Sequence, residues 1–169
     1  MSKSTPKEKR GTYRPVVVGV AIFILLVVAV IGGKEWRASL EAGPDADSIR
    51  EFIGRYFNTW SVKDMTGYGG CFDSSAMVYF IKDGRVVLRQ DKPDFISGQT
   101  EAVIRGPASE EHPESIQIMA EGDLAYARVY WKMTRGSLVK RGYDHFTLLR
   151  TTQGWKIIAL TFYETPAKE

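Results

Sequence analysis

Residues 121–164 read EGDLAYARVYWKMTRGSLVKRGYDHFTLLRTTQGWKIIALTFYE, and this stretch decides the fold. Turn residues at Gly136 and at Gln153-Gly154 divide it into the runs 124–134, 138–150 and 155–164, which read as consecutive strands. The first run alternates: one set of positions holds Ala125, Ala127, Val129, Trp131 and Met133, and the other holds Tyr126, Arg128, Tyr130 and Lys132. Because neighbouring side chains on a strand point to opposite faces, this pattern predicts an antiparallel sheet with one covered face.

The chain before this stretch predicts helices and a hairpin. Apolar residues recur at helical spacing from Ile49 to Trp60, which predicts an amphipathic helix capped by Asp45 or Asp47. An Asp-Gly pair at 83–84 joins the strand-like runs 76–82 and 85–89, the pattern of a β-hairpin. The remaining expected elements are a break or short helix over 64–70, a helix over 91–105, a polar loop over 108–113 and a strand over 115–121. This order has no βαβ crossover, so the predicted class is α+β.

Residues 15–33 read PVVVGVAIFILLVVAVIGG and carry no charge. About 19 residues at ~1.5 Å each span ~29 Å, which matches a hydrocarbon core of ~30 Å, so the run predicts one transmembrane helix. A cleaved secretory signal is the alternative. Such a signal usually has an apolar core of about 7–15 residues that ends at a small-x-small cleavage site, and no A-x-A pattern follows this run.

The basic residues around the apolar run predict its orientation. Those before it are Lys3, Lys7, Lys9, Arg10 and Arg14, and those just after it are Lys34 and Arg37. Because positive charge resists translocation, the N-terminus is expected in the cytoplasm and the folded part outside, held at the cell membrane by a single pass. The expected division is a basic cytoplasmic tail over 1–14, a transmembrane helix over 15–33, a tether over 34–47, a folded domain over 48–165 and a tail over 166–169.

Composition excludes several classes of function. The net charge of +3 is concentrated in the basic tail, so the folded part has no basic stripe for nucleic acid. Cys71 is the single cysteine, which rules out an intramolecular disulfide and a multi-cysteine zinc site. The chain's two histidines, His112 and His145, lie far apart, and no phosphate loop or dinucleotide fingerprint occurs, so neither a metal nor a cofactor is expected.

The layout resembles the nuclear transport factor 2-like superfamily, including its SnoaL-like and ketosteroid-isomerase-like branches. The likeness lies in the helix FIGRYFNTW (52–60), the phrase EGDLAYARV (121–129) and the ending YDHFTLLRTTQGWKIIALTFYE (143–164). The resemblance implies a cystatin-like cone, in which a curved antiparallel sheet wraps around the N-terminal helix and leaves a cavity at its wide end.

The sequence departs from the branches that carry known chemistry. Where many relatives have a His-x-His-like pair after the final Trp-x-Ile, this chain has Ala159 and Thr161. The isomerase branch uses a helix tyrosine with two pocket aspartates. Tyr56 can stand for the tyrosine, but Asp73 precedes its expected strand and Asp144 is expected on the outward face with Arg150. No strand aspartate therefore matches the isomerase pattern.

Several side chains remain as site candidates, each with a structural alternative. Tyr56, His145 and Asp73 are the candidates for acid–base chemistry, although His145 also reads as a structural histidine that points away from Asp144. The residues expected to line the cavity are Tyr56, Trp60, Trp131, His145, Thr161 and Tyr163. Core packing is the alternative for the aromatic members. Cys71 is expected to be a buried apolar residue, because no cation or histidine stands beside it.

The sequence favours a membrane-anchored, extracytoplasmic binding or assembly module without clear catalytic machinery. The outward face of the run 124–134 holds Tyr126, Arg128, Tyr130 and Lys132 and is more aromatic than an ordinary solvent-exposed surface. It is therefore the expected interface for a homodimer or an envelope partner. The alternatives are a small-molecule enzyme of the isomerase or cyclase kind and a passive carrier of an apolar ligand. Both would use the cone cavity.

Overall fold

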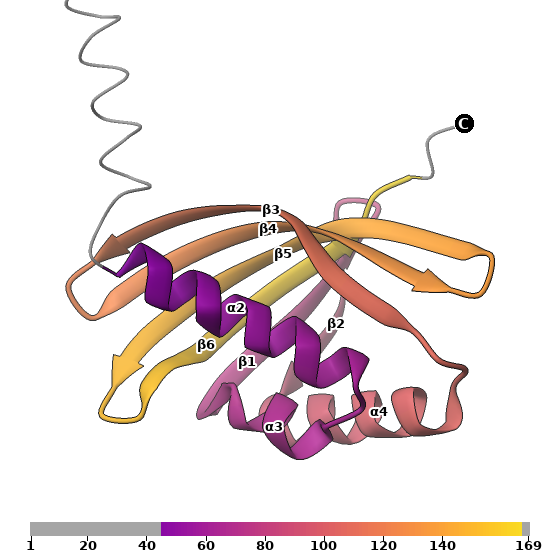
Figure 1. Ribbon diagram of the computed structural model, residues 1–169, viewed down its shortest axis with the longest axis horizontal. Helices are drawn as coiled ribbons and strands as arrows, with labels where there is room; N and C mark the ends of the chain where they lie inside the picture. Colours follow the sequence, from indigo (N-terminus) through magenta and orange to yellow (C-terminus); the bar gives the residue numbers. More distant parts are fainter. Residues whose placement is uncertain (1–44, 167–169) are drawn as a thin grey trace, which may run out of the picture. The chain divides into compact units, whose positions relative to one another are not determined.

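The computed structural model describes residues 45–166 (Figure 1). The predicted cytoplasmic tail and transmembrane helix, and nearly all of the predicted tether, lie outside these residues. Within them, no helix has both the length and the hydropathy that crossing a membrane requires. The elements are α2 (Ala46–Ser61), α3 (Met65–Gly70), β1 (Phe72–Lys82), β2 (Arg85–Asp91), α4 (Lys92–Arg105), β3 (Glu110–Glu121), β4 (Leu124–Arg135), β5 (Leu138–Thr151) and β6 (Gly154–Glu164).

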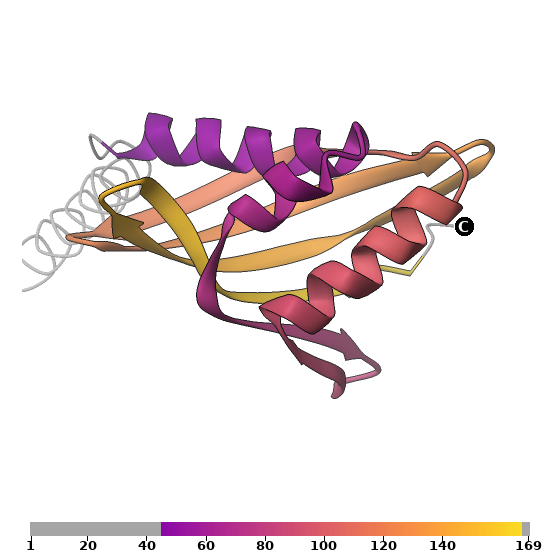
Figure 2. The ribbon, with the colours of Figure 1, turned by 90° about the horizontal axis from the view of Figure 1, so that it is seen from below.

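The strands form one curved six-stranded sheet in the order β2-β1-β6-β5-β4-β3. The predicted α+β class is confirmed, but the prediction of a wholly antiparallel sheet is wrong because β1 pairs with β6 in parallel. All other neighbours are antiparallel. Alternation in the sequence indicates which face of a strand is covered and leaves the direction of a distant neighbour open. Figure 2 shows α4 beside the β1–β2 hairpin and α2 beside β3 and β4.

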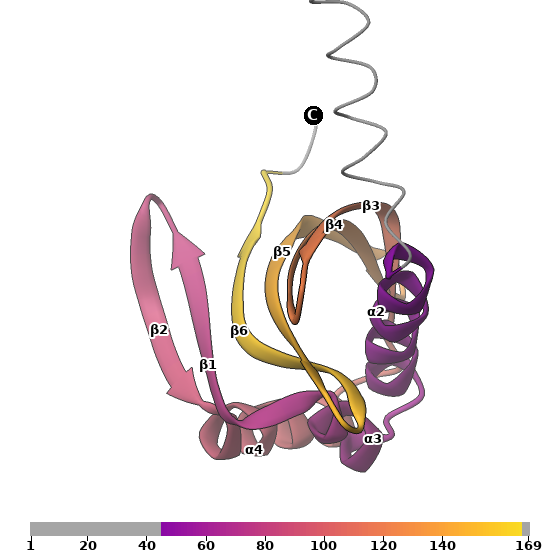
Figure 3. The same cartoon turned by 90° about the vertical axis from the view of Figure 1, so that its left-hand side faces the viewer.

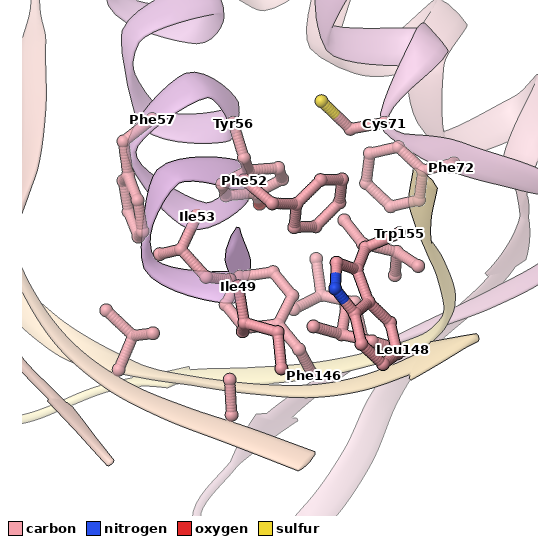
Figure 4. Packing of buried hydrophobic residues seen from close by; sticks show 14 of the residues in the cluster. Ile49, Phe52, Ile53, Tyr56, Phe57, Cys71, Phe72, Phe146, Leu148 and Trp155 are labelled. Atoms are coloured by element: carbon pink, nitrogen blue, oxygen red, sulfur yellow. The ribbon is translucent and has the colours of Figure 1, made fainter. Parts of the chain in front are cut away.

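The predicted amphipathic helix is confirmed as α2, which supplies much of the core. Its inward residues pack against β5 and β6 (Figure 4), and the labelled core residues are Ile49, Phe52, Ile53, Tyr56, Phe57, Cys71, Phe72, Phe146, Leu148 and Trp155. Asp45 is the N-cap, yet its side chain makes no cap hydrogen bond. Its carboxylate instead pairs with Arg150 at the end of β5, which ties the start of the helix to the sheet.

The predicted hairpin is confirmed, and its turn has the expected backbone. Asp83 and Gly84 both have positive φ, 50° and 71°, as a two-residue hairpin turn requires. The helix predicted over 91–105 is α4, which runs without a break through Gly98. Asp91 caps it by accepting a hydrogen bond from the backbone N–H of Asp94. Figure 3 shows the hairpin at one edge of the curved sheet and α2 on the side around which the sheet curls.

The predicted polar loop over 108–113 is wrong in its second half, because β3 already begins at Glu110 and contains Pro113. Proline cannot donate a backbone hydrogen bond and is normally excluded from central strands. Here β3 is an edge strand, and its pairing with β4 shifts register between Pro113 and Ser115. The strand therefore tolerates the proline at an irregular position.

The faces of β4 are as predicted: Ala125, Ala127, Val129, Trp131 and Met133 are buried. The face expected for Asp144 is wrong. On β5 the buried positions are Gly142, Asp144, Phe146 and Leu148, so Asp144 lies on the inner face with only 5% of its surface exposed. Alternate side chains of a strand share one face, so an aspartate between apolar residues of the inner face is buried with them.

Candidate functional site

The concave side of the sheet holds a pocket of about 280 Å³ that also contacts the three helices. Its lining residues are Tyr56, Trp60, Tyr68, Phe95, Gln99, Glu111, Trp131, Met133, Arg135, Leu138, Lys140, Leu160, Phe162 and Glu164. Aromatic rings of the helices and of β4 and β6 form one part of the wall, and the charged side chains of β3 to β6 form another. Small-molecule sites likewise combine apolar surface with polar groups that orient the ligand.

Two tyrosines from different helices meet in the pocket. The hydroxyls of Tyr56 on α2 and Tyr68 on α3 are 2.9 Å apart and hydrogen-bonded, and their ring centroids are 4.9 Å apart. Burial is the main cause that raises the pKa of both phenols, so both remain protonated and able to donate a hydrogen bond. Nearby, Trp60 donates its indole N–H to Gln99 over 3.0 Å, which links α2 to α4.

A buried carboxyl lies behind these rings. The indole N–H of Trp131 donates to Oδ1 of Asp144 over 2.8 Å. Within residues 45–166, every buried side-chain N or O atom has a hydrogen-bond partner. Burial raises the pKa of Asp144 to about 7, and hydrogen bonds from Trp131 and Tyr56 lower it only in part. Asp144 can therefore exchange a proton near neutral pH.

Glu111 is a second carboxyl of the pocket, at the start of β3. Its backbone is held by Ser61, whose hydroxyl accepts from the Glu111 N–H over 2.8 Å and donates to the Glu111 carbonyl over 3.0 Å. Burial, then the nearby Asp144 and Glu164 carboxyls, raise the pKa of Glu111 well above its usual value. Glu111 lines the pocket, whereas Asp144 is buried, bonded to the Trp131 indole, and is not part of the lining.

The cations that line the pocket have partners of their own. Lys140 Nζ lies 2.7 Å from Glu164 Oε1, and both side chains keep more than a third of their surface exposed. Arg135 donates its Nε–H to the Ser109 hydroxyl over 2.8 Å. These contacts orient the two cations, and neither of them is among the causes that shift the pKa of Glu111 or Asp144.

The structure brings together three of the residues predicted to line the cavity, Tyr56, Trp60 and Trp131. It adds Tyr68 and Glu111 to the lining and places the buried Asp144 next to Trp131, and none of the three was indicated by the sequence. Tyr68 lies in a glycine-rich segment, and Glu111 lies in a segment that was expected to be a loop. Asp144 lies on a strand whose even-numbered positions were expected to face outwards and in fact face inwards. The signal in the sequence that could have placed Asp144 on the inner face was the pair of large apolar residues at the neighbouring even-numbered positions, Phe146 and Leu148, both of which are buried.

His145, Thr161 and Tyr163 lie on the opposite face of the sheet, so their predicted place in the cavity is wrong. His145 pairs with Thr161 in the β5–β6 register, and its ring stacks on Tyr163 with centroids 5.9 Å apart. Alternation forces this result, because Asp144 next to His145 is buried. Asp73 accepts from the backbone N–H and the hydroxyl of Ser75 and is absent from the pocket lining. The predicted set of Tyr56, His145 and Asp73 does not assemble.

The outer face of the sheet carries the predicted interface residues together with further aromatic rings. Tyr126 is 51% exposed, and the Arg128 guanidinium lies 4.4 Å from the ring centroid of Tyr143. Tyr143 also contacts Tyr130 and Tyr163, with centroid distances of 4.8 and 5.4 Å. Whether this face binds a partner stays a prediction.

Cys71 is buried, and burial raises the pKa of its thiol, which suits a packing role. In the part of the chain that the structure describes, no group of three or more His, Cys, Asp or Glu side chains could hold a metal ion.

A family model described as "Putative lumazine-binding" matches residues 44–163. Among curated proteins, none matches the chain. Solved structures share its fold. An NTF2-like protein of unknown function from Pseudomonas putida has a TM-score of 0.63 and 16% identity, over 73% of this chain and 88% of that chain.

Two further solved structures show the same likeness. A putative scytalone dehydratase from Novosphingobium aromaticivorans has a TM-score of 0.61 and 13% identity, over 72% of this chain and 85% of that chain. The beta subunit of benzoate 1,2-dioxygenase from Burkholderia mallei has a TM-score of 0.59 and 15% identity, over 72% and 91%. At these identities the likeness establishes the fold alone, and it confirms the predicted nuclear transport factor 2-like cone.

Proposed function

The chain belongs to the family described as "Putative lumazine-binding", and we propose that its folded domain binds a small planar ligand in the pocket between the helices and the sheet. The observation that carries the proposal is the pocket itself, in which the rings of Tyr56, Trp60, Tyr68 and Trp131 line the same space as the polar side chains of Gln99 and Glu111. Aromatic rings offer a planar ligand surface to stack on, and polar groups set its orientation.

The size of the pocket supports a small ligand. Its volume of about 280 Å³ lies just below the range of ~300–1,000 Å³ that ligand pockets occupy. One ring or two fused rings suit this space. Lumazine, the bicyclic compound in the family's description, is therefore a sensible first probe.

The test is a binding titration that follows the indole N–H signals of the chain's four tryptophans by NMR. The Trp131 signal is expected to move with saturation when lumazine or a similar bicyclic ring is added, because its N–H bonds to Asp144 beside the pocket. Met133→Trp should fill the pocket and abolish this shift. Met119→Trp is the matched control, since Met119 is 48% exposed and lies outside the pocket lining. Equal binding by both variants contradicts the proposal.

We also propose that residues 15–33 anchor this domain in the cell membrane, with the N-terminus in the cytoplasm and the domain outside. The uncharged run and the basic residues before it support the anchor and its orientation. Alkaline extraction of membranes should leave the chain in the pellet, and a protease added to spheroplasts should digest the domain. Release of a chain that lacks residues 15–33 would instead indicate a cleaved signal.

One observation favours a second function, proton-transfer catalysis on a small carbonyl compound. Tyr56 and Tyr68 share a hydrogen bond in the pocket wall, and behind it the buried Asp144 accepts the Trp131 indole N–H. The Asp144 pKa of about 7 suits a group that gives and takes protons. This set replaces the one predicted from the sequence. Deuterium exchange next to the carbonyl of small ketones, followed by NMR in heavy water, should be faster with the wild type than with Asp144→Asn. Equal rates would exclude the second function.

A further inference from the structure

Within residues 45–166, two charged side chains of the pocket lining have no partner of opposite charge. The lining holds four charged residues, and two of them, Lys140 and Glu164, pair with each other over 2.7 Å. The other two are Arg135 and Glu111, and the ion pairs of the described residues include neither of them. The charges of the lining therefore balance, and they leave one cationic donor and one carboxyl acceptor for a ligand.

Arg135 and Glu111 lie on the same face of neighbouring strands. Glu111 on β3 is opposite Met133 on β4, and Arg135 is two residues further along β4, so its side chain shares the face of Met133. Diagonal neighbours of this kind on an antiparallel pair are roughly 7–8 Å apart. A guanidinium and a carboxyl at this spacing can both bond to one small polar group between them.

Both residues are held in place by serines outside the pocket lining. Arg135 donates its Nε–H to the Ser109 hydroxyl over 2.8 Å, and its terminal nitrogens make no further hydrogen bond within residues 45–166. Ser61 bonds to both the backbone N–H and the carbonyl of Glu111. Arg135 and Glu111 are also partly buried. Groups that are ordered before a ligand arrives lower the entropic cost of binding it.

The balance of charge favours an uncharged ligand. An ammonium group placed between the two side chains would attract Glu111 and repel Arg135, and a carboxylate would do the reverse. A neutral group with an N–H donor next to a C=O acceptor satisfies both. The rings of Tyr56, Trp60 and Trp131 line the same space and offer their surface to a flat molecule that carries such a group.

We propose that the ligand of this pocket is an uncharged flat ring with a lactam edge, in which a ring N–H stands next to a ring C=O. The inference rests on the proposed function and adds the hydrogen-bonding pattern of the ligand to it. The lactam N–H donates to the Glu111 carboxyl, and the lactam oxygen accepts from the Arg135 guanidinium. Glu111 accepts in either protonation state, because a protonated carboxyl keeps an acceptor oxygen.

The experiment compares lumazine, whose lactam nitrogens carry hydrogen, with its N,N′-dimethyl derivative, which keeps the carbonyls and has no N–H. Both are titrated into the full-length chain in detergent micelles, at a pH at which lumazine is uncharged, and the Trp131 indole N–H signal reports binding. Lumazine is expected to bind the wild type at least about tenfold more tightly than the dimethyl derivative. This comparison needs no variant.

Two variants assign the preference to the two side chains. Glu111→Met removes the acceptor at similar size and should bring the two affinities within about twofold of each other. Arg135→Met should weaken both ligands by about fivefold or more and keep the preference, because both ligands have the carbonyl. Glu110→Met and Arg89→Met are the matched controls, since both residues are exposed and outside the lining, and both should behave as the wild type.

Equal affinity of the wild type for the two ligands overturns the inference. So does a preference that persists in Glu111→Met, because it then reflects the bulk of the methyl groups, and so does unchanged affinity in Arg135→Met. In each of these cases, lumazine binding that Met133→Trp blocks leaves the proposed function standing. If neither ligand binds saturably, both the inference and the proposed function fail.

Discussion

Replacing Asp144 by asparagine is expected to make the fold more stable at neutral and alkaline pH. Asp144 is 5% exposed and accepts the Trp131 indole N–H over 2.8 Å. An asparagine keeps an oxygen for that bond and carries no charge, so the variant avoids the cost of a buried carboxylate. The substitution also puts an N–H donor where the second carboxylate oxygen was, which disturbs the polar contacts of that atom.

The magnitude follows from linkage. The pKa of Asp144 is about 7 in the folded chain, against an ordinary value of 3.8. The folded state therefore binds the Asp144 proton more tightly than the unfolded state does. The contribution of Asp144 to the free energy of unfolding is highest below about pH 4 and falls as the pH rises towards about 7. A difference of roughly three pKa units corresponds to about 4 kcal/mol at pH 8, an upper figure because Asp144 and Glu111 titrate together. After a loss of about 1 kcal/mol for the disturbed contacts of the second side-chain atom, a net gain of roughly 1–3 kcal/mol remains for the variant.

The assay is urea unfolding of the purified chain, followed by tryptophan fluorescence at several pH values between about 4 and 8. The wild type should lose stability over this range, and Asp144→Asn should lose much less. Glu121→Gln is the control, because Glu121 is an exposed carboxylate at the end of β3, and it should follow the wild type. The reasoning is refuted if wild-type stability is flat or rises with pH, or if Asp144→Asn is the less stable chain at pH 8.

Further substitutions test the packing and the outer face. Gly142→Ala should destabilise by roughly 1–3 kcal/mol in urea unfolding, because its Cβ would overlap the Trp131 ring, whereas Gly54→Ala on the open side of α2 should stabilise by about 0.5–1 kcal/mol. Tyr68→Phe should cost about 1 kcal/mol of stability through the lost hydroxyl pair and weaken binding of a ring in the NMR titration. Tyr126→Glu should lower the sedimentation coefficient of any dimer formed through the outer face and leave a monomer unchanged, and a dimer that persists contradicts the predicted interface.

The order of the elements could be predicted because it depends on local patterns. The spacing from Ile49 to Trp60 predicted α2, the Asp83-Gly84 pair predicted the hairpin, and alternation predicted the buried side of β4. These signals act within one helix face or along one strand, where side-chain direction follows from backbone geometry. They also marked the apolar faces that carry Tyr56, Trp60 and Trp131, and in the structure these three side chains line the pocket.

Only the tertiary structure decided where the pocket's polar groups meet. Tyr68, Glu111 and Asp144 come from three elements, and no short-range pattern links them. The parallel pairing of β1 with β6 is likewise a contact between distant segments. By itself, the sequence determined the helices, the strands and most of their covered faces, because local backbone geometry sets those. Which carboxyl became buried and which one lines the pocket depended on how the sheet curls around α2, since burial is a property of all the packed neighbours together.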